Sequence, residues 1–299
     1  MFVHRSGDGL AIAAPAKLNL FLEVQAKRSD GYHEIETLMA PVSLYDQLHW
    51  HSRSDEALSL TCRLAPHLQQ PGLAPLPVGP DNLVLRALER LRQRAGVSAG
   101  ASIALHKTIP WEAGLAGGSA NAAAALLLAN EGWQLHWPRE RLAQVAAELG
   151  SDIPFFFGHG AAICRGRGEL VEPVAGLAGL HAVVVKPAVG LSTAAVYKNC
   201  RPTDVPHHAA QLVAALRAGN WRGIGQHLFN RLQIAAESLC ETIVQLKHWF
   251  SRLNCVAHQM SGSGSSYFGL FRSAGQARRA AALLRAQTSW QVFQVECIV

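Results

Sequence analysis

The alternation of apolar and polar residues near the N-terminus predicts a β-strand over residues 10–24. Every second residue from Leu18 to Leu22 is leucine, so these leucines would share one face of the strand. Lys17 and Asn19 would then share the opposite face. The segment at 28–33, RSDGYH, contains an Asp-Gly pair, which favours a tight turn into the next strand.

Helical spacing of apolar residues predicts helices further along the chain. Leucines recur at that spacing up to about Ala95, and Asp81 and Asn82 stand directly before them, where a helix cap would be. Residues 71–80, PGLAPLPVGP, are too rich in proline for a regular element and predict a loop. Further helices are expected from the alanine-rich segment up to about Asn130, from Pro138 to Gly150, through most of 209–250 and near 274–286.

Short strands are expected between these helices, over 101–105, within 155–190, toward Phe271 and near 290–298. Helices interleaved with antiparallel strands favour an α+β fold. A chain of 299 residues exceeds the size that one hydrophobic core usually serves, so two lobes are expected.

The composition indicates a globular chain, because 49% of the residues are hydrophobic and only 16% are charged. The net charge of +6 suits an anionic small molecule, whereas scattered basic residues argue against nucleic acid. No apolar run approaches the ~20 residues that span a bilayer. The 14 histidines lack metal-ligand spacing, so no metal site is predicted. We expect a cytoplasmic protein that binds neither membrane nor nucleic acid.

The segment Pro110–Ala120, PWEAGLAGGSA, is the strongest chemical signal in the chain. Glycines let backbone N–H groups approach a phosphate, and a helix that follows presents its positive end to the same anion. The segment lacks the Gly-Lys-Ser/Thr of a Walker loop and is not in a dinucleotide-binding unit. Taken alone, it could equally be a plain tight turn.

Its context resolves that choice, because six segments occur in a fixed order over most of the chain: APAKLNLFLEV, DGYHEIETLM, DNL, KTIPWEAGLAGGSANAA, LGSDIPFF and MSGSGSSYFGLF. With this pattern the chain resembles the GHMP kinase superfamily and, within it, the diphosphocytidyl-methylerythritol kinases. The resemblance implies a two-lobed α+β fold with a ribosomal-protein-S5-like N-terminal lobe and a ferredoxin-like α/β-plait C-terminal lobe. It implies a nucleotide-binding domain at 1–170, a second domain at 171–299 and an active site in the cleft between them.

The same resemblance implies an ATP-dependent kinase that phosphorylates the 2-hydroxyl of 4-diphosphocytidyl-2-C-methyl-D-erythritol. Asp152 matches the family's catalytic aspartate, which takes the hydroxyl proton, and Lys17 matches the lysine beside it. The chemistry is consistent, because a weakly acidic hydroxyl needs a base and a nearby ammonium favours the ionised carboxylate. Without the family pattern, Asp152 would be read as a turn cap and Lys17 as an exposed strand residue.

The resemblance also implies the binding residues. ATP, with Mg²⁺ bound to it, is expected at the phosphate loop, whose residues are Pro110, Trp111, Glu112, Ala113, Gly114, Leu115, Ala116, Gly117, Gly118, Ser119 and Ala120, and at Asn82. The substrate, which carries a cytidine diphosphate group, is expected at Asn19, Tyr32, His33, Tyr197, Gly262, Ser263 and Gly264. Two aromatic faces can sandwich a pyrimidine while an imidazole reads its polar edge.

Two positions depart from the commonest family pattern, GLGGGSS. Ala116 stands where glycine is usual, which is unfavourable if that position needs a positive φ. Ala120 replaces the second serine, so Ser119 keeps the hydroxyl for phosphate or magnesium, with Glu112 as a further candidate ligand. Two alternatives stay open, namely another GHMP small-molecule kinase and a non-catalytic nucleotide-binding regulator. A monomer or a homodimer is expected.

Overall fold

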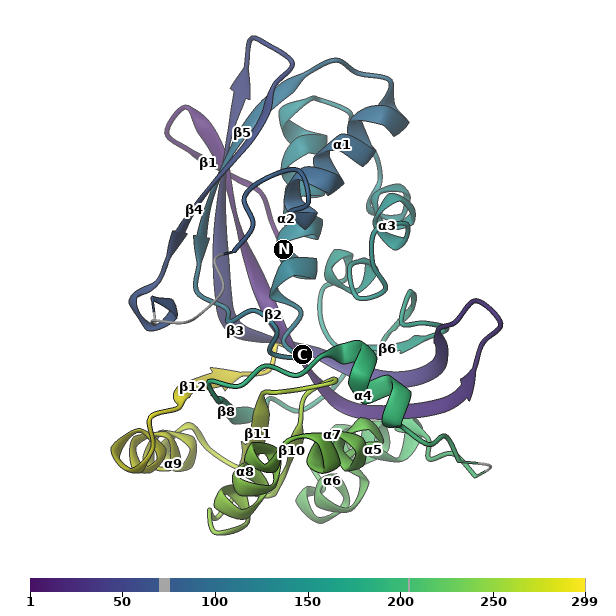
Figure 1. Ribbon diagram of the computed structural model, residues 1–299, viewed down its shortest axis with the longest axis vertical. Helices are drawn as coiled ribbons and strands as arrows, with labels where there is room; N and C mark the ends of the chain where they lie inside the picture. The colour runs from purple at the N-terminus through teal and green to yellow at the C-terminus, as the bar shows by residue number, and fades with distance from the viewer. Residues whose placement is uncertain (70–75, 204, 299) are drawn as a thin grey trace. The chain divides into compact units, whose positions relative to one another are not determined.

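The computed structural model describes residues 1–69, 76–203 and 205–298, and the chain folds into two compact units (Figure 1). The first unit comprises Met1–Ala16, Leu44–Pro110 and Ala116–His159. The second unit comprises Lys17–Ser43, Trp111–Leu115 and Gly160–Val299. Strands β2 and β3 therefore contribute residues to both units. The predicted phosphate loop does so too, with Trp111–Leu115 in the second unit and its remaining residues in the first.

The first unit is a sheet with helices packed on it. Its strands are β1 (His4–Ser6), the start of β2 (Gly9–Lys27), the end of β3 (His33–Arg53), β4 (Leu58–Leu64) and β5 (Gly100–Lys107). β5 runs antiparallel to β3 and parallel to β4, and β1 runs antiparallel to β2. Its helices are η1 (Pro66–Leu68), α1 (Leu83–Ala95), α2 (Gly117–Gly132), α3 (Arg139–Ala147) and η2 (Pro154–Phe157).

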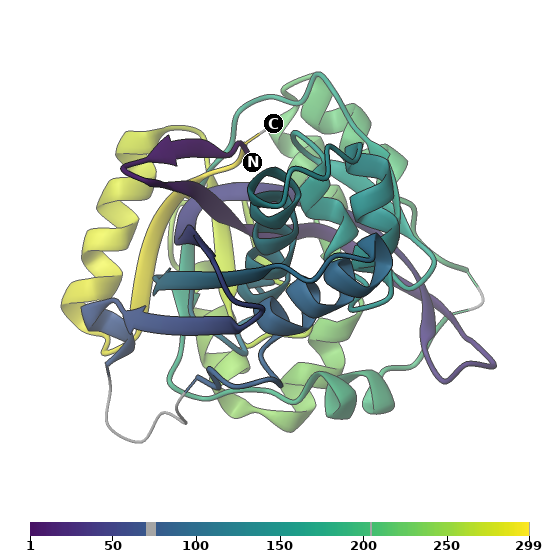
Figure 2. The ribbon, with the colours of Figure 1, turned by 90° about the horizontal axis from the view of Figure 1, so that it is seen from above.

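Helix α2 is the buried element of the first unit, because alanine and leucine occupy every side of it. α1 and α3 both pack against it, and α1 lies beside α2 when the unit is seen from above (Figure 2). Gly132 closes the helix where the Trp50 ring approaches, since a Cβ there would lie 2.4 Å from Trp50 Nε1. The absence of a side chain at Gly132 thus lets Trp50 approach the end of α2 closely.

The second unit contains a four-stranded antiparallel sheet in the order β10-β11-β8-β12. Its strands are β8 (His181–Lys186), β10 (Ala257–Met260), β11 (Tyr267–Phe271) and β12 (Gln291–Glu296). The hairpin of β2 and β3 belongs to the same unit, with β6 (Ala162–Arg165), β7 (Leu170–Pro173) and β9 (Phe229–Asn230). The helices are α4 (Thr193–Asn199), α5 (Ala209–Arg217), α6 (Trp221–His227), α7 (Leu232–Leu239), α8 (Glu241–Ser251) and α9 (Ala274–Gln287).

The core of the second unit forms where α7, α8 and α9 cover one face of this sheet. Phe250, Tyr267 and Leu284 are each fully buried there, in a cluster that extends to Leu22 on β2. Figure 2 shows α9 alongside β12, as expected for two elements in contact. Burial of so many apolar side chains supplies the main stabilisation of the unit.

Most expected elements are present, including the strand at residues 10–24, the turn at Asp30-Gly31 and the final helix and strand. Two details differ. The helix expected to end at Gly150 ends at Ala147, and Gly150 does not have the left-handed φ typical of a glycine after a helix. Pro138 is the N-cap residue of this helix. Helix α4 and strand β4 were not predicted; α4 is short, whereas the alternation of Leu58, Leu60, Cys62 and Leu64 in β4 was overlooked. The loop predicted at 71–80 is irregular from residue 76, and its earlier residues lie outside the described part.

Candidate active site

Lys17 and Asn19 are buried together on β2 in the second unit, each 3% exposed. The Lys17 ammonium donates to Asn19 Oδ1 at 2.5 Å and to the carbonyl of Gly114 at 3.0 Å. Asn19 Nδ2 donates to Thr37 Oγ1 at 2.8 Å. The predicted shared face is therefore confirmed, but it lies inside the unit rather than at its surface. A buried ammonium requires such acceptors.

Gly114 connects Lys17 to the loop after β10. Its carbonyl accepts from Ser261 Oγ at 3.0 Å as well as from Lys17, and Ser266 N donates to the Ala113 carbonyl at 3.1 Å. Gly114 has a φ of 70°, and a Cβ there would lie 2.1 Å from the Ser261 carbonyl oxygen. Only glycine fits at this contact. The second glycine-rich segment thus supports the first.

In the second glycine-rich segment, Gly262 lies next to Lys17. A Cβ at Gly262 would lie 3.1 Å from Asn19 Oδ1 and 3.3 Å from Lys17 Nζ. Its φ is 57°, and that of Gly264 is 88°. Ser263 Oγ is hydrogen-bonded to Thr193 Oγ1 at 2.8 Å, which links the segment to the start of α4. One predicted substrate residue, Gly262, therefore adjoins Lys17 within the second unit.

The rest of the phosphate loop lies in the first unit, at the start of α2. Ala116 has a φ of 53°, the left-handed conformation that made alanine unfavourable here. No side chain caps the helix, and its first turn contains no acidic residue. Gly118 is exposed, with no atom within 4 Å of a Cβ built there. The first turn of α2 is therefore accessible at Gly118, and a helix start of this kind suits an anion.

A buried ion pair underlies this end of α2. Lys107 is 1% and Asp46 0% exposed, and the Lys107 ammonium bonds to one Asp46 oxygen. The other oxygen accepts from Thr108 N at 2.6 Å and from Ile109 N at 2.8 Å. A Cβ at Gly117 would lie 2.9 Å from Lys107 Nζ. Burial lowers the pKa of Lys107, against the opposing effect of Asp46. The sequence reading missed this pair, which shapes the segment before the phosphate loop.

Asp152 lies in the first unit, partly buried in the turn between α3 and η2. Asn82 caps α1 as predicted, because its Oδ1 accepts from Val84 N at 2.9 Å. Its Nδ2 donates to the Pro77 carbonyl at 2.6 Å. The amide therefore has a structural role at the helix start, and its contact with adenine stays a prediction.

The predicted base-binding residues gather on the β2–β3 hairpin and on α4 in the second unit. His33 and Tyr197 face each other with ring centroids 5.2 Å apart. Tyr32 is 53% exposed, and the Arg167 guanidinium lies over its ring at 4.8 Å. Burial, assisted by the positive charge of Lys27, lowers the pKa of His33. Its imidazole is therefore neutral at pH 7, with one nitrogen as donor and the other as acceptor.

A buried lysine near Glu112 was also missed. Lys186 is 6% exposed and donates to the carbonyls of Pro187 at 2.8 Å and Val189 at 3.0 Å. Burial lowers its pKa to about 8, although the charge of Glu112 opposes the shift. A Cβ at Gly190 would lie 3.1 Å from Glu112 Oε2, so this carboxylate packs against the loop that Lys186 holds. No local signal in the sequence indicates such a contact.

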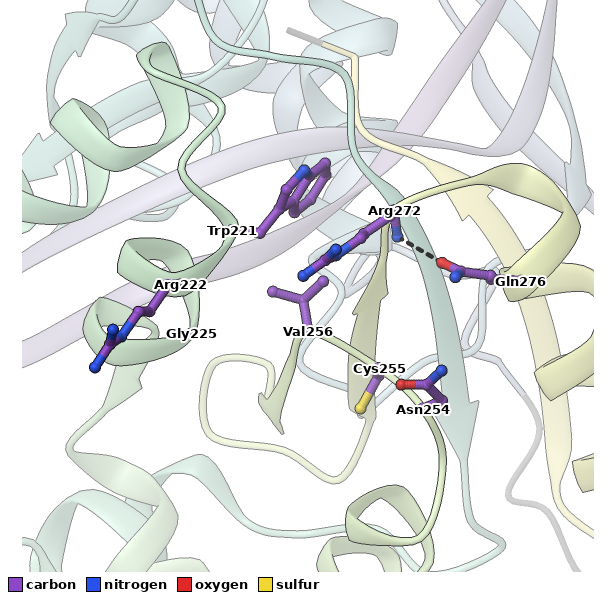
Figure 3. Close-up of a pocket in the computed structure, with 8 residues that line it drawn as sticks. All are labelled: Trp221, Arg222, Gly225, Asn254, Cys255, Val256, Arg272 and Gln276. Carbon is purple, nitrogen blue, oxygen red and sulfur yellow. Dashed lines mark hydrogen bonds between the residues drawn. The ribbon is translucent and has the colours of Figure 1, made fainter.

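A separate pocket of about 520 Å³ lies in the second unit, between the start of α6 and the end of β11 (Figure 3). Trp221, Val256 and Arg272 are among its lining residues, and Gln276 Oε1 accepts from Arg272 N at 3.2 Å. None of the predicted site residues lines it. This pocket therefore does not belong to the candidate site.

Within residues 1–69, 76–203 and 205–298, no group of three His, Cys, Asp or Glu side chains could hold a metal ion. In the same part of the chain, no helix is both long and apolar enough to cross a membrane.

Comparison with known families defines the class of the protein. The family described as "GHMP kinases N terminal domain" matches residues 82–160, which include the phosphate loop and Asp152. The family described as "GHMP kinases C terminal" matches residues 212–288, which include the Gly262–Gly264 segment. The fold is that of a GHMP kinase.

Individual relatives show which family within the GHMP kinases the chain belongs to. A 4-diphosphocytidyl-2-C-methyl-D-erythritol kinase of Pelotomaculum thermopropionicum is 40% identical over 274 residues, covering 91% of this chain and 92% of the relative. One from Alkaliphilus metalliredigens is 35% identical over 269 residues, covering 89% of both chains. A crystal structure of a 4-(cytidine 5'-diphospho)-2C-methyl-D-erythritol kinase matches with a TM-score of 0.78 at 35% identity, covering 95% of this chain and 98% of that one. The chain belongs to the 4-diphosphocytidyl-2-C-methyl-D-erythritol kinase family.

Proposed function

We propose that this protein transfers the γ-phosphoryl group of ATP to the 2-hydroxyl of 4-diphosphocytidyl-2-C-methyl-D-erythritol, in the methylerythritol phosphate pathway to isopentenyl diphosphate. The observation that supports this most is the buried Lys17, whose ammonium bonds to Asn19 and to the phosphate-loop carbonyl of Gly114. A protein that only bound a nucleotide would gain little from a desolvated cation at that point.

In this proposal Asp152 is the general base and Lys17 its electrostatic partner. The acceptor hydroxyl is too weakly acidic to ionise at pH 7, so a carboxylate must take its proton as the bond to phosphorus forms. The Lys17 ammonium would favour the ionised carboxylate and offset negative charge on the transferring group. Its two hydrogen bonds fix the ammonium in place before the reaction, which lowers the cost of reorganisation.

ATP would bind at Pro110–Ala120, with its phosphates against the N–H groups at the start of α2. Exposed Gly118 leaves the backbone accessible there, and Ser119 supplies a hydroxyl. Mg²⁺ would arrive with the nucleotide. Ser119 and Glu112 offer the oxygen ligands that this cation prefers, while the phosphates and water would provide the others.

The cytidine group would bind to Tyr32, His33 and Tyr197. Tyrosine faces stack on a pyrimidine with little dependence on its substituents. The neutral imidazole of His33 can donate to one edge atom and accept from another, which suits cytosine. Gly262, Ser263 and Gly264 would approach the part of the substrate next to the reacting hydroxyl.

Three further features belong to the same proposal. The nucleotide-binding domain would extend to about residue 170, with the active site between it and the domain that follows. The protein would work in the cytoplasm as a monomer or a homodimer. It would bind neither nucleic acid nor membrane, and its net charge of +6 would attract two substrates that both carry phosphates.

The test is ADP release by the purified protein with Mg-ATP and the complete substrate, compared with CDP and with methylerythritol phosphate as acceptors. We expect release only with the complete substrate, and a loss of ~10²-fold or more in kcat for Asp152→Asn with ATP binding unchanged. Asp8→Asn, at a carboxyl group whose side chain is 92% exposed, is the matched control. Release with a different hydroxyl acceptor, or undiminished turnover by Asp152→Asn, would contradict the proposal.

A further inference from the structure

We propose that Arg167 determines how the substrate's base is bound, by covering one face of Tyr32 and leaving the opposite face for stacking. This inference rests on the proposed function, since it concerns the same cytidine group. Arg167 lies on the turn between β6 and β7 and was not indicated by the sequence pattern.

The contact between the two side chains is direct. The central carbon of the Arg167 guanidinium lies 4.8 Å from the centroid of the Tyr32 ring, within the range of a cation–π interaction. Tyr32 nevertheless remains 53% exposed, so a large part of its side chain is accessible. A planar ligand can therefore stack on Tyr32 only from the face that Arg167 does not occupy.

The turn that presents Arg167 is attached to the hairpin that presents Tyr32. Gly166 N donates to Glu34 Oε1 at 3.0 Å, and Ile35 N donates to the Gly166 carbonyl at 2.9 Å. Gly166 and Gly168 have φ values of 72° and 119°, which a glycine on each side of Arg167 permits. These two backbone contacts fix the position of Arg167 relative to the start of β3.

Arg167 and Tyr32 are also held individually. Arg167 N donates to Glu169 Oε2 at 2.7 Å, and its guanidinium lies 3.6 Å from Glu169 Oε1. Tyr32 N donates to Asp30 Oδ1 at 3.1 Å. Because the two residues are ordered by separate neighbours, their stacking is prepared before any ligand binds. Such preorganisation reduces the conformational entropy that is lost on binding.

Two consequences follow for the substrate. The guanidinium fixes the plane of the Tyr32 ring, so the base meets a surface of defined orientation. The positive charge also lies beside a ring expected to bind a base that carries a diphosphate. A lysine at position 167 would keep the charge but lose the planar stacking surface. Arg167 thus contributes to selection of a planar base through Tyr32.

A double-mutant cycle with CDP as the probe, measured by isothermal titration calorimetry, tests the inference. Arg167→Ala should raise the Kd for CDP about two- to fivefold, the usual range for one exposed cation–π contact. Arg167→Lys should recover only part of the loss. In a Tyr32→Leu background the same Arg167→Ala substitution should have little further effect, since the ring it orients is gone. The KM for ATP and the thermal unfolding midpoint should stay unchanged.

An unchanged Kd for CDP in Arg167→Ala would overturn the inference. It would equally be overturned by a loss of the same size in both backgrounds, because Arg167 would then act on the diphosphate alone and independently of Tyr32. These results differ from a failure of the proposed function itself, in which the unmodified protein would neither bind CDP nor release ADP with the complete substrate.

Discussion

Lys17 Nζ and Asn19 Oδ1 are 2.5 Å apart on the same face of β2, in the interior of the second unit. The orientation of the amide follows from its other contact. Asn19 Nδ2 donates to Thr37 Oγ1, whose own proton is given to the Phe21 carbonyl at 2.6 Å. Thr37 can therefore only accept from Asn19, and the amide oxygen is turned toward the lysine.

Asn19→Leu should therefore lower kcat by about 10- to 100-fold, since a hydrogen bond to a charged group contributes ~1.5–3 kcal/mol. The KM for ATP should change much less, because the variant displaces the ammonium without altering the phosphate loop. Steady-state kinetics give both parameters. Thr37→Ser keeps the hydroxyl that orients the amide and should behave like the unmodified protein. Full kcat in Asn19→Leu would mean that the lysine does not need Asn19 to hold its position.

Glu23 is 0% exposed and is held by Arg231 through two bonds of 2.6 and 2.8 Å. Burial alone would raise the pKa of this carboxyl group, but the bonds from Arg231 and His207 outweigh burial and lower the pKa. Arg231→Met leaves a buried charge without its main partner. It should reduce the free energy of unfolding by ~3–5 kcal/mol in urea titrations at pH 7.

The matched control is Arg53→Met, which removes an exposed pair with Asp55 and should have a much smaller effect, because solvent screens exposed ion pairs. The lowered pKa of Glu23 also fixes the sign of a pH effect. Stability from this group is present above its ordinary pKa of 4.5 and is lost as the pH falls through the lower folded-state value. An equal cost for both variants would indicate that Glu23 finds another partner or releases its charge.

Local features of the sequence predicted much of this structure. Alternation placed Lys17 and Asn19 on one face, and Asn82 was expected at the start of α1, where it is the cap. Substitution of alanine for glycine at position 116 indicated strain, and the φ there is 53°. Each of these predictions depends on residues that are neighbours along the chain.

Pairs distant in the sequence could not be predicted in this way. Glu23 and Arg231 are 208 residues apart, and Lys107 meets Asp46 across 61 residues. Each side chain, taken alone, is typical of a solvated surface. Only the fold brings the members of each pair together, so burial of these charges could not be inferred from composition or spacing.

Lys186 predicts a pH dependence of the same sign as that of Glu23, but in an alkaline window. Its pKa is lowered from 10.5 to about 8, so the folded state binds fewer protons than the unfolded state between these values. Stability should therefore rise with pH across that window, by about 1 kcal/mol per pH unit. Unfolding titrations of Lys186→Met alongside the unmodified protein isolate this contribution.

The unmodified protein should gain stability relative to Lys186→Met from pH 8 to pH 10, whereas the two should run parallel between pH 6 and pH 7. The reason is that other titrating groups are common to both proteins and cancel in the difference. A constant difference across the whole range would show that Lys186 keeps its proton as an ordinary lysine does.

Two glycines of the phosphate loop should respond differently to the same substitution. A Cβ at Gly114 would lie 2.1 Å from the Ser261 carbonyl oxygen, at a φ of 70°. Gly114→Ala should therefore cost more than ~2 kcal/mol in the free energy of unfolding and abolish activity. At Gly118 no atom lies within 4 Å of such a Cβ, and the residue is in the first turn of α2.

Gly118→Ala should leave stability unchanged or raise it by up to ~1 kcal/mol, because alanine favours a helix over glycine. Its methyl group would nevertheless lie where the ATP phosphates are proposed to contact the backbone. The KM for ATP should therefore rise about tenfold or more, which corresponds to a loss of ~1.4 kcal/mol or more in binding free energy. Kinetics and urea titrations on both variants separate the two effects. An unchanged KM in a stable Gly118→Ala protein would place the phosphates away from the first turn of α2.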